Sequence, residues 1–330
     1  MDQSLRPVAD YSDADLLLHS AGPTSAIRYT ARLRDVFRAA QEQKKVAVLH
    51  STAQHVLSPM TSLAYELHGG FGSEYDLDSY PLWAVDDHAS GRVFEGVTGR
   101  AAGSVQELRA PATRNAETVF PAEAQPQHAA LRFGVHRIQR PDEDIPAGAV
   151  AEFLLPRLGA GAPQAWGSTE PLTEPWDLAA VHADTDRAPR SFEPFSVPAT
   201  YLSDGHGSWG AITVQAGKAG VIEYTTGSIP LGPYPEDLTY ATGVAVSACR
   251  ALASACPSVT QTVLTLRDVD PGMFRSVRPH VPERALVRMQ GPRAAPDFTF
   301  WADREHDNLE IVGEHPYQAG ITALGGKVFA

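Results

Sequence analysis

The stretch PEDLTYATGVAVSACRALASACPSVTQTVLTL, residues 235–266, carries the strongest fold signal in the chain. Its first part predicts a helix over residues 235–255 that ends before Pro257. Small and apolar side chains recur at helical spacing along one face of this helix: Leu238, Ala241, Ala245, Cys249 and Leu252. Residues 259–266 are apolar and β-branched on both faces, which is typical of a central strand. The stretch therefore predicts a long helix followed by the middle strand of a sheet.

The N-terminal part of the chain alternates helices with short strands. Residues 29–50 predict a helix with one apolar stripe and then a buried strand. The stripe consists of Tyr29, Leu33, Val36, Phe37 and Ala40. Residues 53–67 predict a second helix, in which Pro59 produces a kink or marks the true start. The segments 80–85 and 92–96 are separated by turn residues and predict a hairpin. This order indicates a small α/β lobe.

The remainder of the chain predicts a second lobe. Residues 130–138 alternate apolar and polar side chains and predict a strand, while residues 208–227 predict a hairpin. A helix is expected to begin near Thr173, because Pro175 suits a first helical turn. We therefore expect an α+β (mixed α/β) fold with two lobes, each a small sheet flanked by helices. The expected parts are an N-terminal α/β lobe over residues 1–110, a proline-containing linker or surface segment over 111–127, and a C-terminal α+β lobe over 128–330.

The charge and hydropathy of the chain exclude several classes of protein. Its formal net charge is −12, which argues against proteins that bind nucleic acid or anionic lipid through Lys and Arg. The longest apolar run, around residues 243–255, is interrupted by Arg250 and falls short of the ~20 residues that cross a bilayer. The acidic N-terminus has no signal-peptide core. We therefore expect a soluble, cytoplasmic protein.

The two cysteines of the chain do not predict a disulfide. Cys249 and Cys256 are seven residues apart in one predicted helix. Seven residues correspond to about 10.5 Å of helical rise, which is longer than a disulfide spans. We expect both to be small buried side chains in a reducing compartment.

Motifs for metal binding and catalysis are almost absent. Twelve histidines occur, but none lies in an H-E-x-x-H pattern or beside a cysteine partner. The sequence therefore predicts no metal site and no cofactor, and it assigns no catalytic residue. One combination stays open: His50 and His55 flank a predicted strand-to-helix turn, and Asp86, Asp87 and His88 follow the next strand. If the fold brought these residues together, they could form a site, and a hydrolase could use His50, His55 or Asp86.

Aromatic side chains are concentrated in the C-terminal half. Such side chains either fill a core or anchor an interface. Four of them lie on or beside the predicted hairpin and form our candidate binding surface: Tyr201, Trp209, Tyr224 and Trp301. A hairpin strand can offer a free edge to an incoming segment. The alternative is that these side chains close the core against the helix over residues 235–255.

A block around two tryptophans is the most distinctive sequence motif of the chain. It reads Trp166-Gly167-Ser168-Thr169-Glu170-Pro171, followed by Pro175-Trp176. We expect this block to be structural, with Trp166 and Trp176 largely buried. The block resembles the W-G-[ST]-x-E-P…P-W signature of an uncharacterised actinobacterial family encoded beside type VII (ESX-type) secretion genes. The resemblance extends loosely over residues 25–270 and implies a cytoplasmic role in binding secreted substrates. It brings no catalytic residues with it.

The sequence thus favours a non-enzymatic cytoplasmic accessory or chaperone-like module of actinobacterial type VII secretion. Its expected partner is another protein, such as a secreted substrate or a secretion component, and neither nucleic acid nor a membrane is expected. Two alternatives remain open: a hydrolase that uses His50, His55 or Asp86, and a structural component of a larger assembly. An enzyme needs convergent polar groups in a pocket, whereas a chaperone needs an exposed apolar patch or a free sheet edge.

Overall fold

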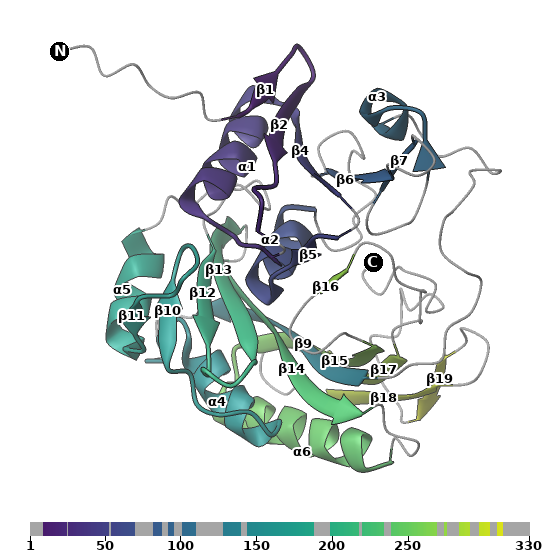
Figure 1. Ribbon diagram of the computed structural model, residues 1–330. Helices are drawn as coiled ribbons and strands as arrows, with labels where there is room; N and C mark the ends of the chain where they lie inside the picture. Colours follow the sequence, from purple (N-terminus) through teal and green to yellow (C-terminus); the bar gives the residue numbers. More distant parts are fainter. Residues whose placement is uncertain are drawn as a thin grey trace. The chain divides into compact units, whose positions relative to one another are not determined.

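A computed structural model of the chain shows two compact units, which are described separately below (Figure 1). Unit 1 comprises Met1–Gly70, Glu74–Ala124 and Met273–His280, and unit 2 comprises Phe71–Ser73, Gln125–Gly272 and Val281–Ala330. Helices and strands are both abundant, which confirms the α+β class. The structure describes residues 9–24, 26–52, 54–69, 82–87, 92–95, 101–109, 128–139, 144–187, 199–217, 220–233, 239–268, 274–275, 284–290, 297–303 and 309–312.

Unit 1 contains a six-stranded sheet in the order β1-β2-β4-β6-β7-β8. The strands are β1 (Tyr11–Ser12), β2 (Leu16–Ser20), β4 (Val46–Thr52), β6 (Leu82–Asp87), β7 (Arg92–Glu95) and β8 (Ala101–Ala102). β2, β4 and β6 run parallel, and the outer strands pair antiparallel to them. A separate three-stranded sheet joins β16 (Phe274–Arg275), β5 (Val56–Leu57) and β3 (Ala26–Ile27). The predicted hairpin corresponds to β6 and β7 and is confirmed.

Two helices of unit 1, α1 (Ala31–Gln43) and α2 (Pro59–Gly69), connect its parallel strands as βαβ crossovers require, and a third, the short α3 (Val105–Arg109), follows β8. The predicted apolar stripe of α1 is buried, and Thr30 caps the helix by accepting a hydrogen bond from the Leu33 N–H. In α2 the Ser58 hydroxyl accepts from the Thr61 N–H at 3.1 Å. Pro59 therefore marks the true start of this helix, where its missing N–H costs nothing.

Unit 2 is built on a ten-stranded antiparallel sheet in the order β11-β10-β12-β13-β14-β9-β15-β17-β18-β19. The strands are β9 (His128–Gln139), β10 (Ala165–Gly167), β11 (Glu174–Pro175), β12 (Thr200–Ser203), β13 (Trp209–Gly217), β14 (Gly220–Pro233), β15 (Val259–Asp268), β17 (Arg284–Gln290), β18 (Asp297–Asp303) and β19 (Leu309–Val312). β15 lies between β9 and β17, which confirms the central strand expected from its sequence. Three helices belong to this unit: α4 (Ala149–Arg157), α5 (Leu178–Arg187) and α6 (Thr239–Ala255).

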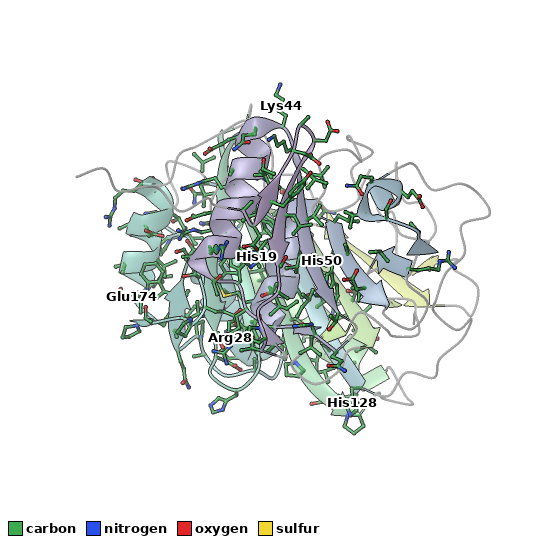
Figure 2. The ribbon with its side chains drawn as sticks, turned by 45° about the horizontal axis from the view of Figure 1, so that its top comes forward. His19, Arg28, Lys44, His50, His128 and Glu174 are labelled. Carbon is green, nitrogen blue, oxygen red and sulfur yellow. The ribbon has the colours of Figure 1, made fainter. Side chains whose placement is uncertain are left out.

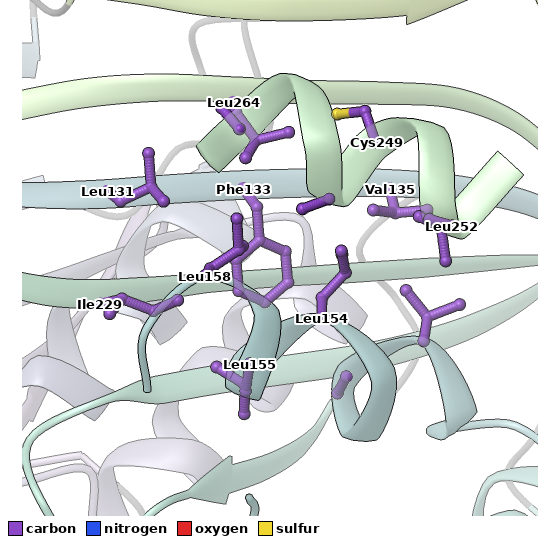
Figure 3. Close-up of a cluster of buried hydrophobic side chains, with 14 of the residues drawn as sticks. Leu131, Phe133, Val135, Leu154, Leu155, Leu158, Ile229, Cys249, Leu252 and Leu264 are labelled. Atoms are coloured by element: carbon purple, nitrogen blue, oxygen red, sulfur yellow. The ribbon is translucent and has the colours of Figure 1, made fainter. Parts of the chain in front are cut away.

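The core of unit 2 lies between one face of this sheet and its helices (Figure 3). Phe133 of β9 and Leu264 of β15 meet Leu154 of α4 and Leu252 of α6. Cys249 and Cys256 belong to the same cluster, and both are buried thiols rather than halves of a disulfide. Burial raises the pKa of the Cys249 thiol above its ordinary value, so this thiol is unreactive near neutral pH.

A buried ion pair connects the sheet to the start of α4. Arg137 of β9 contacts Glu223 of β14 through two guanidinium nitrogens, and both side chains are fully buried. Arg137 also donates to the Ile145 carbonyl at 2.8 Å. Glu223 accepts from the Gly148 N–H at 3.3 Å and from the Thr225 hydroxyl at 3.1 Å. These bonds satisfy the two charges and hold the turn that leads into α4.

Candidate functional site

The candidate site lies at the carboxyl ends of the parallel strands of unit 1. In open α/β sheets, ligands usually bind at this edge. Val46 and Val48 of β4 belong to a buried cluster together with Ala84 of β6. Side chains alternate between the two faces of a strand. His50 and Asp86 therefore follow these residues on the same face, where the sheet leaves its core.

His50 and Asp86 form a direct contact. The distance from His50 Nε2 to Asp86 Oδ2 is 2.9 Å, and the side chains are 28% and 29% exposed. Asp86 accepts from Nε2–H and so orients the imidazole, which leaves Nδ1 as the basic nitrogen. Both groups remain accessible to water, so the pair can exchange protons with a bound molecule. The structure thus brings together two of the three residues that the sequence suggested for a hydrolase.

His55 does not join this pair. Its Nδ1 lies 2.9 Å from the Thr52 hydroxyl and 3.2 Å from the Thr52 N–H, while its Nε2 lies 3.0 Å from the Gly22 carbonyl. An N–H must donate to the carbonyl, so Nε2 carries the proton and Nδ1 accepts. Both nitrogens are occupied, and His55 connects the turn after β4 to the loop after β2. The side chains of Asp87 and His88 lie outside the described residues.

A second polar cluster lies at the carboxyl end of β2, on residues that the sequence did not single out. Asp10 Oδ1 contacts Arg32 Nη2 at 2.5 Å, and Asp10 Oδ2 accepts from the Ser20 N–H at 2.7 Å. His19 Nδ1 lies 3.4 Å from the same carboxylate. His19 and His50 occupy neighbouring strands (Figure 2). No sequence signal marks this cluster, because its members come from three separate elements.

Burial and neighbouring charges shift the pKa values of Asp10 and His19. Burial by itself would raise the pKa of Asp10, but the Ser20 hydrogen bond and the positive charge of Arg32 lower it below its ordinary value. Burial lowers the pKa of His19, and the Asp10 carboxylate opposes that effect only in part. Asp10 is therefore a carboxylate and His19 a neutral imidazole near neutral pH.

Metal binding finds no support in the described part of the chain. Among these residues, no group of three or more His, Cys, Asp or Glu side chains is placed to hold a metal ion.

No described helix is long and apolar enough to cross a membrane.

Comparison with protein families assigns the C-terminal part of the chain. A family model described as DUF6177, C-terminal domain, matches residues 130–327. The chain belongs to this family. The match begins within β9, so His50 and Asp86 lie outside it. Comparison with curated proteins and with solved structures finds no match.

The predicted free hairpin edge in the DUF6177 domain is wrong. β13 and β14 form the hairpin, but β12 pairs with β13 over Trp209–Ile212 and β9 pairs with β14 over Val221–Pro233, so the hairpin lies inside the sheet. Tyr201 of β12 is only 1% exposed and so is not available to a partner. The physical reason is that the sheet continues on both sides of the hairpin, by three strands beyond β13 and five beyond β14, and neighbouring strands pair through their backbone groups. The side chain of Trp301, in β18, lies outside the described residues.

The other two residues of the predicted binding surface are half-buried. Trp209 lies at the start of β13, and the Tyr224 ring packs against the His136 ring with their centroids 4.5 Å apart. Gly134 makes room for this tyrosine: a Cβ at this glycine would lie 2.9 Å from the Tyr224 hydroxyl oxygen. Tyr224 therefore covers a glycine on its neighbouring strand, which is a packing role.

The tryptophan block of the DUF6177 domain forms the short strands at one end of the sheet. Trp166 of β10 pairs in register with Glu174 of β11. The helix predicted to begin near Thr173 begins at Leu178 instead, because Asp177 caps it by accepting from the Ala179 N–H at 2.9 Å. The block also contains Gly167, Glu170, Pro171 and Pro175.

Both tryptophans of this block are half-buried rather than largely buried, and both pack against the core of unit 2. The Trp176 Nε1–H donates to Glu152 Oε1 of α4 at 3.2 Å. Full burial is not reached because Trp166 lies in a short strand at the margin of the sheet and Trp176 directly follows β11 there, where less structure covers a large ring.

Half-burial limits the expected cost of removing a tryptophan. Trp166→Ala should lower the free energy of unfolding by about 2 kcal/mol, below the ~3–5 kcal/mol of a fully buried tryptophan. In a unit of this size that corresponds to a decrease in Tm of about 4–8 °C. Thermal unfolding followed by circular dichroism measures the change. Trp166→Phe is the matched control and should recover most of the loss. A Tm equal to that of the wild type would show that the ring contributes no packing.

Proposed function

We propose that the chain is a protein-binding accessory module that acts in the cytoplasm, with the chaperone-like role in actinobacterial type VII secretion that its tryptophan block implies. The observation that carries this proposal is the exposure of Tyr240. Its side chain is 82% exposed in the first turn of α6. Leu231, near the end of β14, is 38% exposed and precedes α6 in the chain. Together with the exposed Pro230 and Pro233, these residues are called the Tyr240 surface below.

The chemistry of the Tyr240 surface suits the recognition of a protein segment. A tyrosine offers a large apolar ring and a hydroxyl while losing little conformational entropy on binding. Such residues dominate the binding energy of many interfaces. The net charge of −12 favours association with a basic or neutral segment rather than an acidic one, mainly by accelerating encounter. The proposed partner is therefore a neutral or basic segment of a secreted protein.

Removal of the tyrosine tests this proposal. Tyr240→Ala should weaken binding of a purified partner by about 30-fold, the equivalent of an anchor worth about 2 kcal/mol. The partner is first identified by mass spectrometry of proteins retained from the host, and its affinity is then measured by calorimetry. Tyr11→Ala is the matched control, because Tyr11 is 52% exposed but belongs to unit 1.

The result separates the proposal from two alternatives. Equal affinities of the two variants and the wild type would overturn the Tyr240 surface as a binding site. If Tyr240→Ala instead breaks up a self-associated form of the chain, detected by sedimentation, a structural role in a larger assembly is favoured.

A second candidate function is hydrolysis at the His50–Asp86 pair. The observation that favours it is the 2.9 Å contact between an oriented imidazole and a carboxylate at the carboxyl edge of a parallel sheet. Such a pair can accept and return a proton during attack on a bound substrate.

A further inference from the structure

A serine lies beside His50 on the face of the sheet that also carries Asp86, whose own register partner on β4 is Thr52. The parallel register places Ser20 of β2 beside His50 of β4. Residues in register on adjacent strands point to the same side, and the strands lie about 4.8 Å apart. Asp86 contacts His50 from β6, on the other side of β4. Across the sheet the order is therefore hydroxyl, imidazole and carboxylate.

The alternation of side chains supports this arrangement independently. Leu16, Val48 and Ala84 belong to one buried cluster, with one member on each of β2, β4 and β6. Ser20, His50 and Asp86 follow these residues at even spacings along the same three strands. Even spacing along a strand keeps a side chain on the same face. The three polar groups therefore share one face and lie immediately beyond its apolar core.

The backbone around Ser20 is held in place from both sides. The Ser20 N–H donates to Asp10 Oδ2 at 2.7 Å, and the Ala21 N–H donates to the His50 carbonyl at 2.7 Å. His55 fixes the next residue through the Gly22 carbonyl. Within the described part of the chain the exposed Ser20 hydroxyl makes no hydrogen bond, so it can rotate toward His50. A nucleophile and its base often approach closely only once substrate is bound.

We propose that Ser20 is a nucleophile, activated by His50 and oriented through Asp86, and that the site hydrolyses carboxylic esters. This inference rests on the second candidate function, acid–base chemistry at His50. His50 can return one proton to the leaving group, and an alcohol leaves a tetrahedral intermediate more readily than an amine does. Ser20 and the pair are all accessible, so an ester can reach the hydroxyl.

The chemical step uses only these groups and water. Ser20 Oγ attacks the ester carbonyl carbon while its proton passes to His50 Nδ1. The carbon–oxygen bond to the alcohol then breaks, and the alcohol leaves with that proton. Water next attacks the acyl-serine, again giving a proton to His50, and this proton returns to Ser20 Oγ as the carboxylic acid departs. Asp86 holds the imidazolium through Nε2–H in both halves.

Labelling with a fluorophosphonate tests the nucleophile directly. The full chain is incubated with the probe, and the modified residue is located by peptide mass spectrometry. We expect one label per chain, on Ser20, and none on the Ser20→Ala variant. His50→Gln should slow labelling by at least about 100-fold, the usual contribution of a general base. Ser12→Ala is the matched control, because Ser12 is an exposed serine on the neighbouring strand β1. Thermal unfolding confirms that each variant is folded.

Hydrolysis of p-nitrophenyl acetate tests separately whether Ser20 is the nucleophile and whether the site is a hydrolase. Loss of activity in both Ser20→Ala and His50→Gln supports the nucleophile. Activity that needs His50 but survives Ser20→Ala would overturn Ser20 and leave direct attack by water. Activity that needs neither residue would overturn the hydrolase function itself. Failure of wild-type Ser20 to react with the probe would also overturn the nucleophile, whatever the variants do.

Discussion

Replacing Glu223 by alanine is expected to lower the free energy of unfolding of the C-terminal unit by about 3–5 kcal/mol. The substitution leaves the fully buried guanidinium of Arg137 without its counter-charge. It also leaves the Gly148 N–H and the Thr225 hydroxyl without their acceptor. A buried charge that has lost its partner is much more costly than the intact pair is stabilising, because water cannot replace the missing carboxylate.

Chemical denaturation measures this effect through the midpoint and slope of unfolding. Glu174→Ala is the matched control, because Glu174 is an exposed carboxylate in the same unit, and it should change stability by less than about 0.5 kcal/mol. The double variant Arg137→Met with Glu223→Leu should recover part of the loss, since it removes both charges together. A cost below about 1 kcal/mol for Glu223→Ala would mean that water reaches the pair.

The second large effect is a loss of stability in mild acid that depends on His136. Burial lowers the pKa of this imidazole from 6.5 to about 4. The unfolded chain therefore binds a proton between pH 6.5 and about pH 4 that the folded chain does not bind. Stability consequently falls as the pH decreases through this window. At about 1.4 kcal/mol for each pKa unit, the loss attributable to His136 is about 3 kcal/mol by pH 4.

Comparison of unfolding free energies at pH 7 and pH 4.5 isolates this contribution. His136→Gln should flatten the pH dependence relative to the wild type, although the loss of contact with Tyr224 makes it less stable at pH 7. His206→Gln is the matched control, since His206 is an exposed histidine of the same unit. Identical slopes for His136→Gln and the wild type would show that His136 takes up its proton in the folded state.

The residues of the two proposed functions lie in different units. The family match, the buried Arg137–Glu223 pair and the Tyr240 surface belong to unit 2, whereas Ser20, His50 and Asp86 belong to unit 1. The binding and hydrolysis experiments therefore address separate residues. Tyr240→Ala should leave ester hydrolysis unchanged, so the two proposals can succeed or fail independently.

Several elements were predictable because their signals are local. The helical stripe of α1, the proline at the start of α2, and the apolar run of β15 depend only on neighbouring residues. β2 was missed, since five residues with an apolar start do not distinguish a strand from other buried segments. β11 was not predicted, because Pro175 favours the first turn of a helix. Its pairing with β10 holds it in a strand instead.

The sequence by itself determined the α+β class, the amphipathic helices, the central strand and the two buried thiols, because periodicity and composition act over a few residues. Only the tertiary structure decided which polar groups meet. His50 joined Asp86 and not His55, since strand register and alternation placed the first two on one face. Arg137 met Glu223 across 86 positions of sequence, and Tyr201 became a buried residue of β12, a strand that pairs with β10 and β13. Such contacts depend on strand order and register. These are properties of the whole sheet and cannot be predicted from the residues next to each partner in the sequence.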